Sequence, residues 1–216
     1  MNWTDKLKHH QSTLLGIENY KKYAVCIPLI FSEEGCKVLF EVRASHIAHQ
    51  PGDICFPGGK IEAGETPEQA AVREKMEELL IEEEQLEMYG LMDVLINGTS
   101  QMIYPFASEL KEYQGTWSKD EVETTFVVPL DYFLNTEPEL FYTRVESIPE
   151  EDFPFDRIHD GKKYSWRKSR NEIYFYSYEG HEIWGLTAKI MKSFVDIIRK
   201  SASSDLDEMQ NISHLT

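Results

Sequence analysis

Three glutamates, Glu74, Glu77 and Glu78, are spaced so that an α-helix would bring them to one face. The segment from residue 67 to about 80 predicts such a helix, and each residue of a helix advances about 100° around its axis. Glu77 and Glu78 then fall about 60° and 40° to either side of Glu74. The opposite face is apolar and consists of Val72, Met76, Leu79 and Leu80.

Carboxylates that converge repel one another, and hard oxygen ligands gathered at one point are what Mg²⁺ or Mn²⁺ requires. The alternative is a solvated acidic face, on which charges of both signs usually alternate. Lys75 is the one clear cation near the glutamates, and Gly58, Gly59 and Gly64 let the backbone fold back close to them. These features favour a divalent metal site over a solvated face.

Strand and helix patterns around this segment indicate a single α/β domain over residues 1–200. The helix has a start signal, because Thr66 suits the N-cap, Pro67 the first turn and Gln69 a capping box. Strands are predicted at 24–31 and 37–43, which form a hairpin, and at 86–96, 101–108 and 123–130. Amphipathic patterns predict helices at 1–20 and 183–200, and the polar residues 201–216 are predicted to form a flexible tail.

The composition limits what this domain can bind. The 216 residues include 22 Lys and Arg against 38 Asp and Glu, which gives a net charge of -16 at pH 7. So acidic a protein is not expected to bind nucleic acid non-specifically or to lie on an anionic membrane. A small anionic substrate would need positive charge at the site, and a divalent metal ion supplies it.

The cysteines and the N-terminus indicate a cytoplasmic protein. Cys26, Cys36 and Cys55 cannot all pair and have no CxxC spacing, so we expect reduced thiols; one disulfide with one free thiol is the alternative. The first residues lack the apolar run of a signal peptide, and no stretch approaches the length of a membrane span. The sequence leaves a homodimer open.

The stretch from Gly59 to Ile81 resembles the Nudix box, a spaced pattern of glycine, arginine and glutamates. The matching positions are Gly59, Glu65, Arg73, Glu74, Glu77, Glu78 and Ile81. Lys75 replaces a small or apolar residue of the pattern, and Leu80 replaces a glycine. We expect Lys75 at the edge of the acidic face, where it is tolerated. Leu80 suggests a helix that runs on into the following glutamates.

This resemblance implies the Nudix fold, an α+β arrangement in which a mixed β-sheet is sandwiched between α-helices. It also implies hydrolysis of a nucleoside diphosphate linked to another group. By position, Glu74 and Glu78 would be the main ligands of Mg²⁺ or Mn²⁺. Glu77 would be a third ligand and the Gly59 carbonyl a further one.

The stretch before the box resembles a segment shared by Nudix enzymes that cleave coenzyme A. The matching positions are Arg43, Ala44, Gly52, Phe56, Pro57, Gly58 and Gly59. Arg43, Phe56 and Gly58 would therefore bind substrate. Two positions differ, because Glu41 replaces a threonine and Ala48 replaces a second arginine.

Together the two resemblances imply a Mg²⁺- or Mn²⁺-dependent diphosphatase. It would cleave coenzyme A, or its thioesters, to 3′,5′-ADP and a 4′-phosphopantetheine product. Because Ala48 replaces the arginine, the alternative function is that of a Nudix pyrophosphatase acting on ADP-ribose, NADH or nucleoside triphosphates. A Nudix-like nucleotide-binding module without catalysis is the third reading, but Glu74, Glu77 and Glu78 are all retained.

Several supporting roles follow from position. In the resemblance, Arg73 would orient the glutamates by ion pairing and Glu65 would support the turn before the helix. Glu121 or Glu123, just before a predicted strand, could serve as general base. The segment 157–170 carries six Lys and Arg against one Asp. It could contact a distal phosphate of the substrate or form a solvated hairpin.

Overall fold

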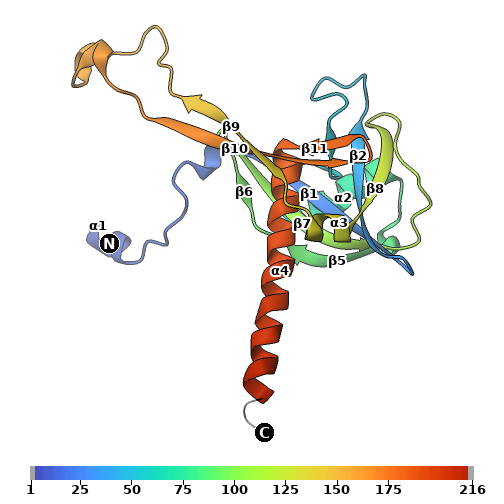
Figure 1. Ribbon diagram of the computed structural model, residues 1–216. Helices are drawn as coiled ribbons and strands as arrows, with labels where there is room; N and C mark the ends of the chain where they lie inside the picture. Colours follow the sequence, from blue (N-terminus) through green and yellow to red (C-terminus); the bar gives the residue numbers. More distant parts are fainter. Residues whose placement is uncertain (1–2, 214–216) are drawn as a thin grey trace.

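The computed structural model describes residues 3–213, with side chains described for residues 3–201, and shows two β-sheets covered by helices (Figure 1). Among these residues the larger sheet runs β3-β2-β1-β7-β5, with β4 beside β1, β6 beside β7 and β8 beside β2. Its strands are β1 (Lys21–Ser32), β2 (Gly35–Arg43), β3 (Ile54–Cys55), β4 (Gly58–Lys60), β5 (Leu86–Leu91), β6 (Leu95–Ile96), β7 (Gln101–Leu110) and β8 (Val122–Pro129). Strand β1 is parallel to β7 and antiparallel to β2, so the sheet is mixed, and the predicted hairpin is confirmed.

A smaller sheet and the helices complete the fold. The smaller sheet orders β11 (His181–Trp184), β10 (Lys168–Tyr178) and β9 (Glu139–Glu146), all antiparallel. The α-helices are α1 (Trp3–Lys8), α2 (Pro67–Leu79), α3 (Leu130–Asn135) and α4 (Gly185–Ser213). Short 3₁₀ turns lie at η1 (Ile17–Asn19), η2 (Glu83–Gln85), η3 (Phe155–Arg157) and η4 (Gly161–Lys163).

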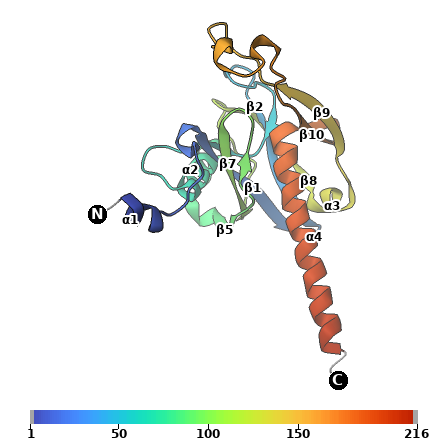
Figure 2. The same ribbon diagram turned by 90° about the vertical axis from the view of Figure 1, so that its left-hand side faces the viewer.

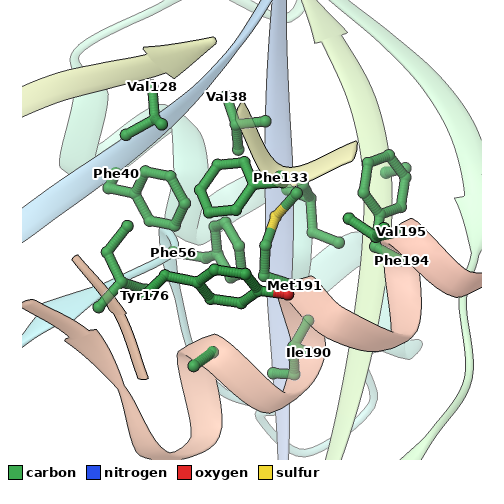
Figure 3. Close-up of a cluster of buried hydrophobic side chains, with 14 of the residues drawn as sticks. Val38, Phe40, Phe56, Val128, Phe133, Tyr176, Ile190, Met191, Phe194 and Val195 are labelled. Carbon is green, nitrogen blue, oxygen red and sulfur yellow. The ribbon is translucent and has the colours of Figure 1, made fainter. Parts of the chain in front are cut away.

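Helices cover both faces of the large sheet, with α2 on one side and α4 on the other (Figure 2). On the α4 side, Phe40 packs with Phe133 of α3, Tyr176 of β10 and Met191 of α4 (Figure 3). The apolar residues on the α2 side are Ala24, Leu39, Ala70, Ala71, Leu79, Ile81, Phe106 and Leu110. The predicted fold, a mixed sheet between α-helices, is therefore confirmed.

The prediction of a helix over residues 1–20 is wrong. Within its described part, helix α1 ends at Lys8, and Gly16 adopts a left-handed conformation with φ of 82° before η1. Leu14 and Leu15, which the prediction placed on an apolar face, are exposed. A short helix with no apolar surface to pack against is marginal in water, so the amphipathic pattern does not suffice here.

The prediction for the C-terminal region needs two corrections. Helix α4 begins at Gly185 rather than 183, because Ile183 and Trp184 pair with β10 as part of β11. It continues through Ser213, where a flexible tail was predicted from residue 201; residues 214–216 lie outside the described part. This stretch contains no Gly or Pro to end the helix. None of the described helices is long and apolar enough to cross a membrane.

Helix α2 begins as predicted and ends earlier than predicted. Thr66 and Gln69 form the capping box, each side chain accepting a hydrogen bond from the other's backbone N–H. Leu80 adopts the left-handed conformation, with φ 52° and ψ 54°, and so ends the helix as a glycine would. The turn directs Ile81 into the core beside Leu79. The free energy gained by burying Ile81 outweighs the strain of the left-handed conformation at Leu80.

Candidate active site

The glycine pair of β4 brings the backbone against helix α2. Strand β4 pairs with β1, so Gly58 lies opposite Val25 and Gly59 opposite Ala24. A Cβ atom at Gly58 would collide with the backbone of Ala24 and Val25, and one at Gly59 would collide with the carboxylate of Glu74. The sheet backbone therefore requires glycine at position 58, whereas glycine at position 59 leaves the space that the Glu74 carboxylate occupies.

Glu78 is buried at the centre of this site, with only 3% of its surface exposed. Its Oε2 atom accepts a hydrogen bond of 2.7 Å from the backbone N–H of Gly58. Burial raises the pKa of Glu78 to about 8, with a further contribution from the charge of Glu74, against the lowering effect of the Gly58 hydrogen bond. The glycine pair thus fixes the orientation of this carboxyl group.

Lys75 does not lie at the edge of an acidic surface, as we predicted. It is fully buried, and its Nζ atom donates a hydrogen bond of 2.6 Å to Ser108 Oγ on β7. Burial lowers the pKa of Lys75. The helix therefore rests on the sheet through the side that carries Ala71, Lys75, Glu78 and Leu79, while Met76 is only half-buried. The small side chain of Ala71 allows the close approach, and Ser108 supplies the polar partner that makes the buried Lys75 tolerable.

Arg73 contacts the other three carboxylates around the start and middle of α2. Its Nε atom lies 2.7 Å from Glu65 Oε1 and its Nη2 atom 3.1 Å from Glu65 Oε2, a bidentate pair. Its Nη1 atom lies 2.9 Å from Glu74 Oε1 and 3.2 Å from Glu77 Oε2. One guanidinium group thus offsets the repulsion among three carboxylates. Burial nevertheless raises the pKa of Glu74, and Arg73 opposes that rise.

Glu41 on β2 is a site residue that the sequence reasoning missed. Only 1% of it is exposed, and its carboxyl group lies against that of Glu78. Its pKa is raised well above the usual value, first by burial and then by the charge of Glu78. The signal was available, because Glu41 is a lone charge within the run Val38–Val42 of a strand that packs on both faces.

The three predicted substrate-binding residues have different surroundings. Arg43 is half-buried, donates from Nε to the carbonyl of His49 at 3.2 Å, and lowers the pKa of Glu78 through its charge. Phe56 is 97% covered and stacks on Phe40 at 5.0 Å between ring centroids, so its ring packs in the core, and its contact with substrate stays a prediction. The Gly58 N–H is donated to Glu78, so Gly58 orients this carboxylate.

Of the two candidates for general base, the structure brings only Glu121 toward the carboxylates. Glu121 is exposed, and its charge raises the pKa of Glu41, Glu74 and Glu78. Glu123 instead accepts hydrogen bonds from the backbone N–H and the hydroxyl of Ser45, at 3.3 and 3.2 Å.

The basic segment 157–170 lies away from this site. It belongs to the connection between β9 and β10, which projects from the body of the protein (Figure 1). Within it, Lys168 pairs with Glu146 at 3.0 Å and Arg170 lies over the ring of Tyr142. This placement favours the solvated hairpin over contact with a distal phosphate.

The donor atoms of this site suit a hard divalent ion. In the described part of the chain, no group of three or more His, Cys, Asp or Glu side chains is arranged to hold a metal ion. Arg73 holds Glu74 and Glu77, while Gly58 holds Glu78. The donors are nevertheless carboxylate oxygens, and the buried Oε1 atom of Glu41 beside Glu78 has no hydrogen-bond partner among the described residues. A divalent cation would offset the repulsion that these carboxylates otherwise retain.

The protein thus has a mixed sheet between helices and an acidic helix set against the glycine pair of β4, and comparison with known proteins identifies this class of fold and site. The NUDIX domain model matches residues 20–150. The chain belongs to the Nudix family, as the sequence predicted, and Nudix hydrolases generally use divalent metal ions.

Three similar proteins illustrate the relationship. The peroxisomal coenzyme A diphosphatase NUDT7 of Mus musculus is 31% identical over 134 residues, which are 61% of this chain and 56% of that protein. The chain thus matches little more than half the length of this relative. The uncharacterized Nudix hydrolase NudL of an Enterobacter species is 28% identical over 177 residues, 81% of each chain. The solved structure of a C. elegans Ap4A hydrolase is 21% identical, with a TM-score of 0.44, and the match covers 50% of this chain and 80% of that chain.

The two glycines of β4 should respond differently to the same substitution. Gly59→Ala should fold normally, because Glu74 can swing away, but should lower kcat by about 100-fold or more through the misplaced carboxylate. Gly58→Ala should lower the free energy of unfolding by about 3 kcal/mol, since the sheet backbone cannot yield. Urea unfolding and metal-dependent hydrolysis of a pyrophosphate substrate measure both effects. Normal turnover by Gly59→Ala would contradict the assigned contact.

The buried Glu78 should make stability depend on pH when metal is chelated. Its pKa is about 8 in the folded chain against 4.5 as the ordinary value, so the folded state binds more protons between these values. The free energy of unfolding should therefore fall, by on the order of a few kcal/mol, as the pH rises from about 5 to 8. Glu78→Gln should give a shallower slope and Glu123→Gln, an exposed control, the wild-type slope. Equal slopes in wild type and Glu78→Gln would refute the burial effect.

Proposed function

We propose that this protein is a Mg²⁺- or Mn²⁺-dependent pyrophosphohydrolase whose substrate is coenzyme A or an acyl-CoA. Its products would be 3′,5′-ADP and 4′-phosphopantetheine, or the acylated form of the latter. The observation that carries the proposal is that the glycine pair of β4 lies against two carboxylates of α2, Gly58 against Glu78 and Gly59 against Glu74. One carboxylate is held by Arg73 and the other by the Gly58 N–H.

Glu74 and Glu78 would hold the metal, with Glu77 and the Gly59 carbonyl as further ligands. When bound, the metal would supply positive charge that offsets the negative charge of the pyrophosphate oxygens, and it would also lower the pKa of the attacking water. The chain's own part is positioning. Arg73 keeps Glu74 and Glu77 in place, and the Gly58 N–H aims Glu78.

Glu121 is our candidate for the general base. It is exposed and faces the buried carboxylates from the segment before β8, so it can accept a proton from the attacking water and release it to solvent. Glu123 is less suited, because its carboxylate is engaged by Ser45.

Two observations support coenzyme A as substrate. The first is the similarity to the mouse coenzyme A diphosphatase. The second is Arg43, which lies close enough to Glu41 and Glu78 to lower the pKa of both. A guanidinium beside the metal ligands can bind a substrate phosphate.

The observation that favours another Nudix substrate is the exposed Ala48, where the coenzyme A segment has an arginine. ADP-ribose, NADH and nucleoside triphosphates are the alternatives. A non-catalytic module is disfavoured because the carboxylates are not only retained but also held in place by Arg73 and Gly58.

The cysteines are reduced, which supports a location in a reducing compartment such as the cytoplasm. Cys26, Cys36 and Cys55 are all free thiols, so the alternative of one disulfide is wrong. Burial raises the pKa of Cys36 to about 11, and such thiols are unreactive.

The proposal is tested by product identification. Purified protein is incubated with coenzyme A, acetyl-CoA, ADP-ribose, NADH and ATP, each with Mg²⁺ or Mn²⁺, and the products are identified by mass spectrometry. We expect 3′,5′-ADP from the coenzyme A substrates with the highest kcat/KM. Glu74→Gln should lower that rate by orders of magnitude. Preferred cleavage of ADP-ribose or NADH would replace the substrate but keep the reaction class, and no cleavage of any substrate would contradict the enzyme assignment.

The same assay with Ala48→Arg probes the coenzyme A branch. A new charge-assisted contact to a phosphate should lower the KM for coenzyme A by about tenfold, without a similar gain for ADP-ribose. Ala48→Gln is the matched control, because it adds length without charge. Equal KM values for the two variants would show that this loop does not contact the substrate.

A further inference from the structure

Glu41 is an acidic side chain that the fold buries against a second acid, Glu78. It lies in β2, where it is the register partner of Cys55 on β3 and of Thr125 on β8. Because side chains alternate along a strand, it shares the α2 side of the sheet with Leu39, while Phe40 points to the other core. Only 1% of its surface is exposed.

The surroundings of Glu41 do not satisfy its carboxyl group. It lies against Glu78, a second buried acid, and its Oε1 atom has no hydrogen-bond partner among the described residues. The two nearby cations have other partners: Arg43 Nε donates to the carbonyl of His49, and Lys75 Nζ donates to Ser108. Leaving a buried oxygen without a partner costs on the order of 1–3 kcal/mol, so its retention calls for an explanation.

We infer that Glu41 is a further oxygen ligand of the divalent metal ion beside Glu78, an inference that rests on the proposed metal-dependent function. Two facing carboxylates carry the charge that one Mg²⁺ or Mn²⁺ neutralises, and both offer the hard oxygens that these ions prefer. Glu41 comes from the sheet and Glu78 from the helix, so the ion would join the two elements. The resembling coenzyme A segment has threonine here, so this ligand is a property of this chain.

The test measures metal binding directly and without substrate. Mn²⁺ is titrated into the metal-free full chain and free Mn²⁺ is followed by electron paramagnetic resonance. Glu41→Gln keeps the size and hydrogen-bonding capacity of the side chain but removes the charge. We expect its Kd for Mn²⁺ to rise by about tenfold or more. Glu123→Gln is the control, an exposed acid on the neighbouring strand, and should bind as wild type does.

Thermal unfolding separates ligation from a structural role. In chelator, Glu41→Gln should be at least as stable as wild type, because an unpaired buried acid is removed, and added Mn²⁺ should raise its Tm less than that of wild type. Glu41→Thr, the residue of the resembling segment, should behave in the same way and serves if the Gln variant folds poorly.

Wild-type affinity for Mn²⁺ in both Glu41 variants would overturn the inference and leave the proposed hydrolysis untouched. A wild-type chain that binds no Mn²⁺ would also overturn it, and the substrate assay then decides separately whether the proposed function survives.

Discussion

The fold gathers several carboxylates in one place, and their mutual repulsion must be offset. Glu41, Glu74 and Glu78 are withdrawn from water to different degrees, and burial raises the pKa of each. Two compensating contacts are built in: the Arg73 guanidinium on Glu74 and the Gly58 N–H on Glu78. They orient the carboxylates but do not neutralise all of them. The remaining negative charge is what gives a divalent cation its binding energy.

The elements around the site can be understood as supports for this arrangement. Strand β4 is only three residues long, yet its pairing with β1 places the glycine pair where no Cβ atom fits. Helix α2 is fixed at its start by the Thr66 capping box and at its end by the left-handed turn at Leu80. The cores on both faces of the sheet then hold strand and helix in register. A site of this kind needs such rigidity, because repelling side chains separate wherever the backbone yields.

Sequence reasoning succeeded where the determinants are local. The hairpin of β1 and β2 and the start of α2 depend on spacing, turn residues and capping, all of which are local. It failed where tertiary contacts decide. The side of α2 that faces the sheet is set by Ser108, distant in sequence, which accepts the buried Lys75. The place of Phe56 in a motif could not show that its ring packs in the aromatic core around Phe40. The apolar pattern of residues 1–20 could not show whether a surface exists for it to cover.

The central claim is that the carboxylates beside the glycine pair of β4 bind a divalent ion. Anomalous diffraction at the manganese edge, from crystals soaked in Mn²⁺, tests it most directly because it locates the ion among named atoms. The account predicts an anomalous peak within coordination distance of carboxylate oxygens of both Glu74 and Glu78, at about 2.0–2.2 Å. A map in which these side chains keep their contacts to Arg73 and Gly58, with the ion elsewhere or absent, would contradict it.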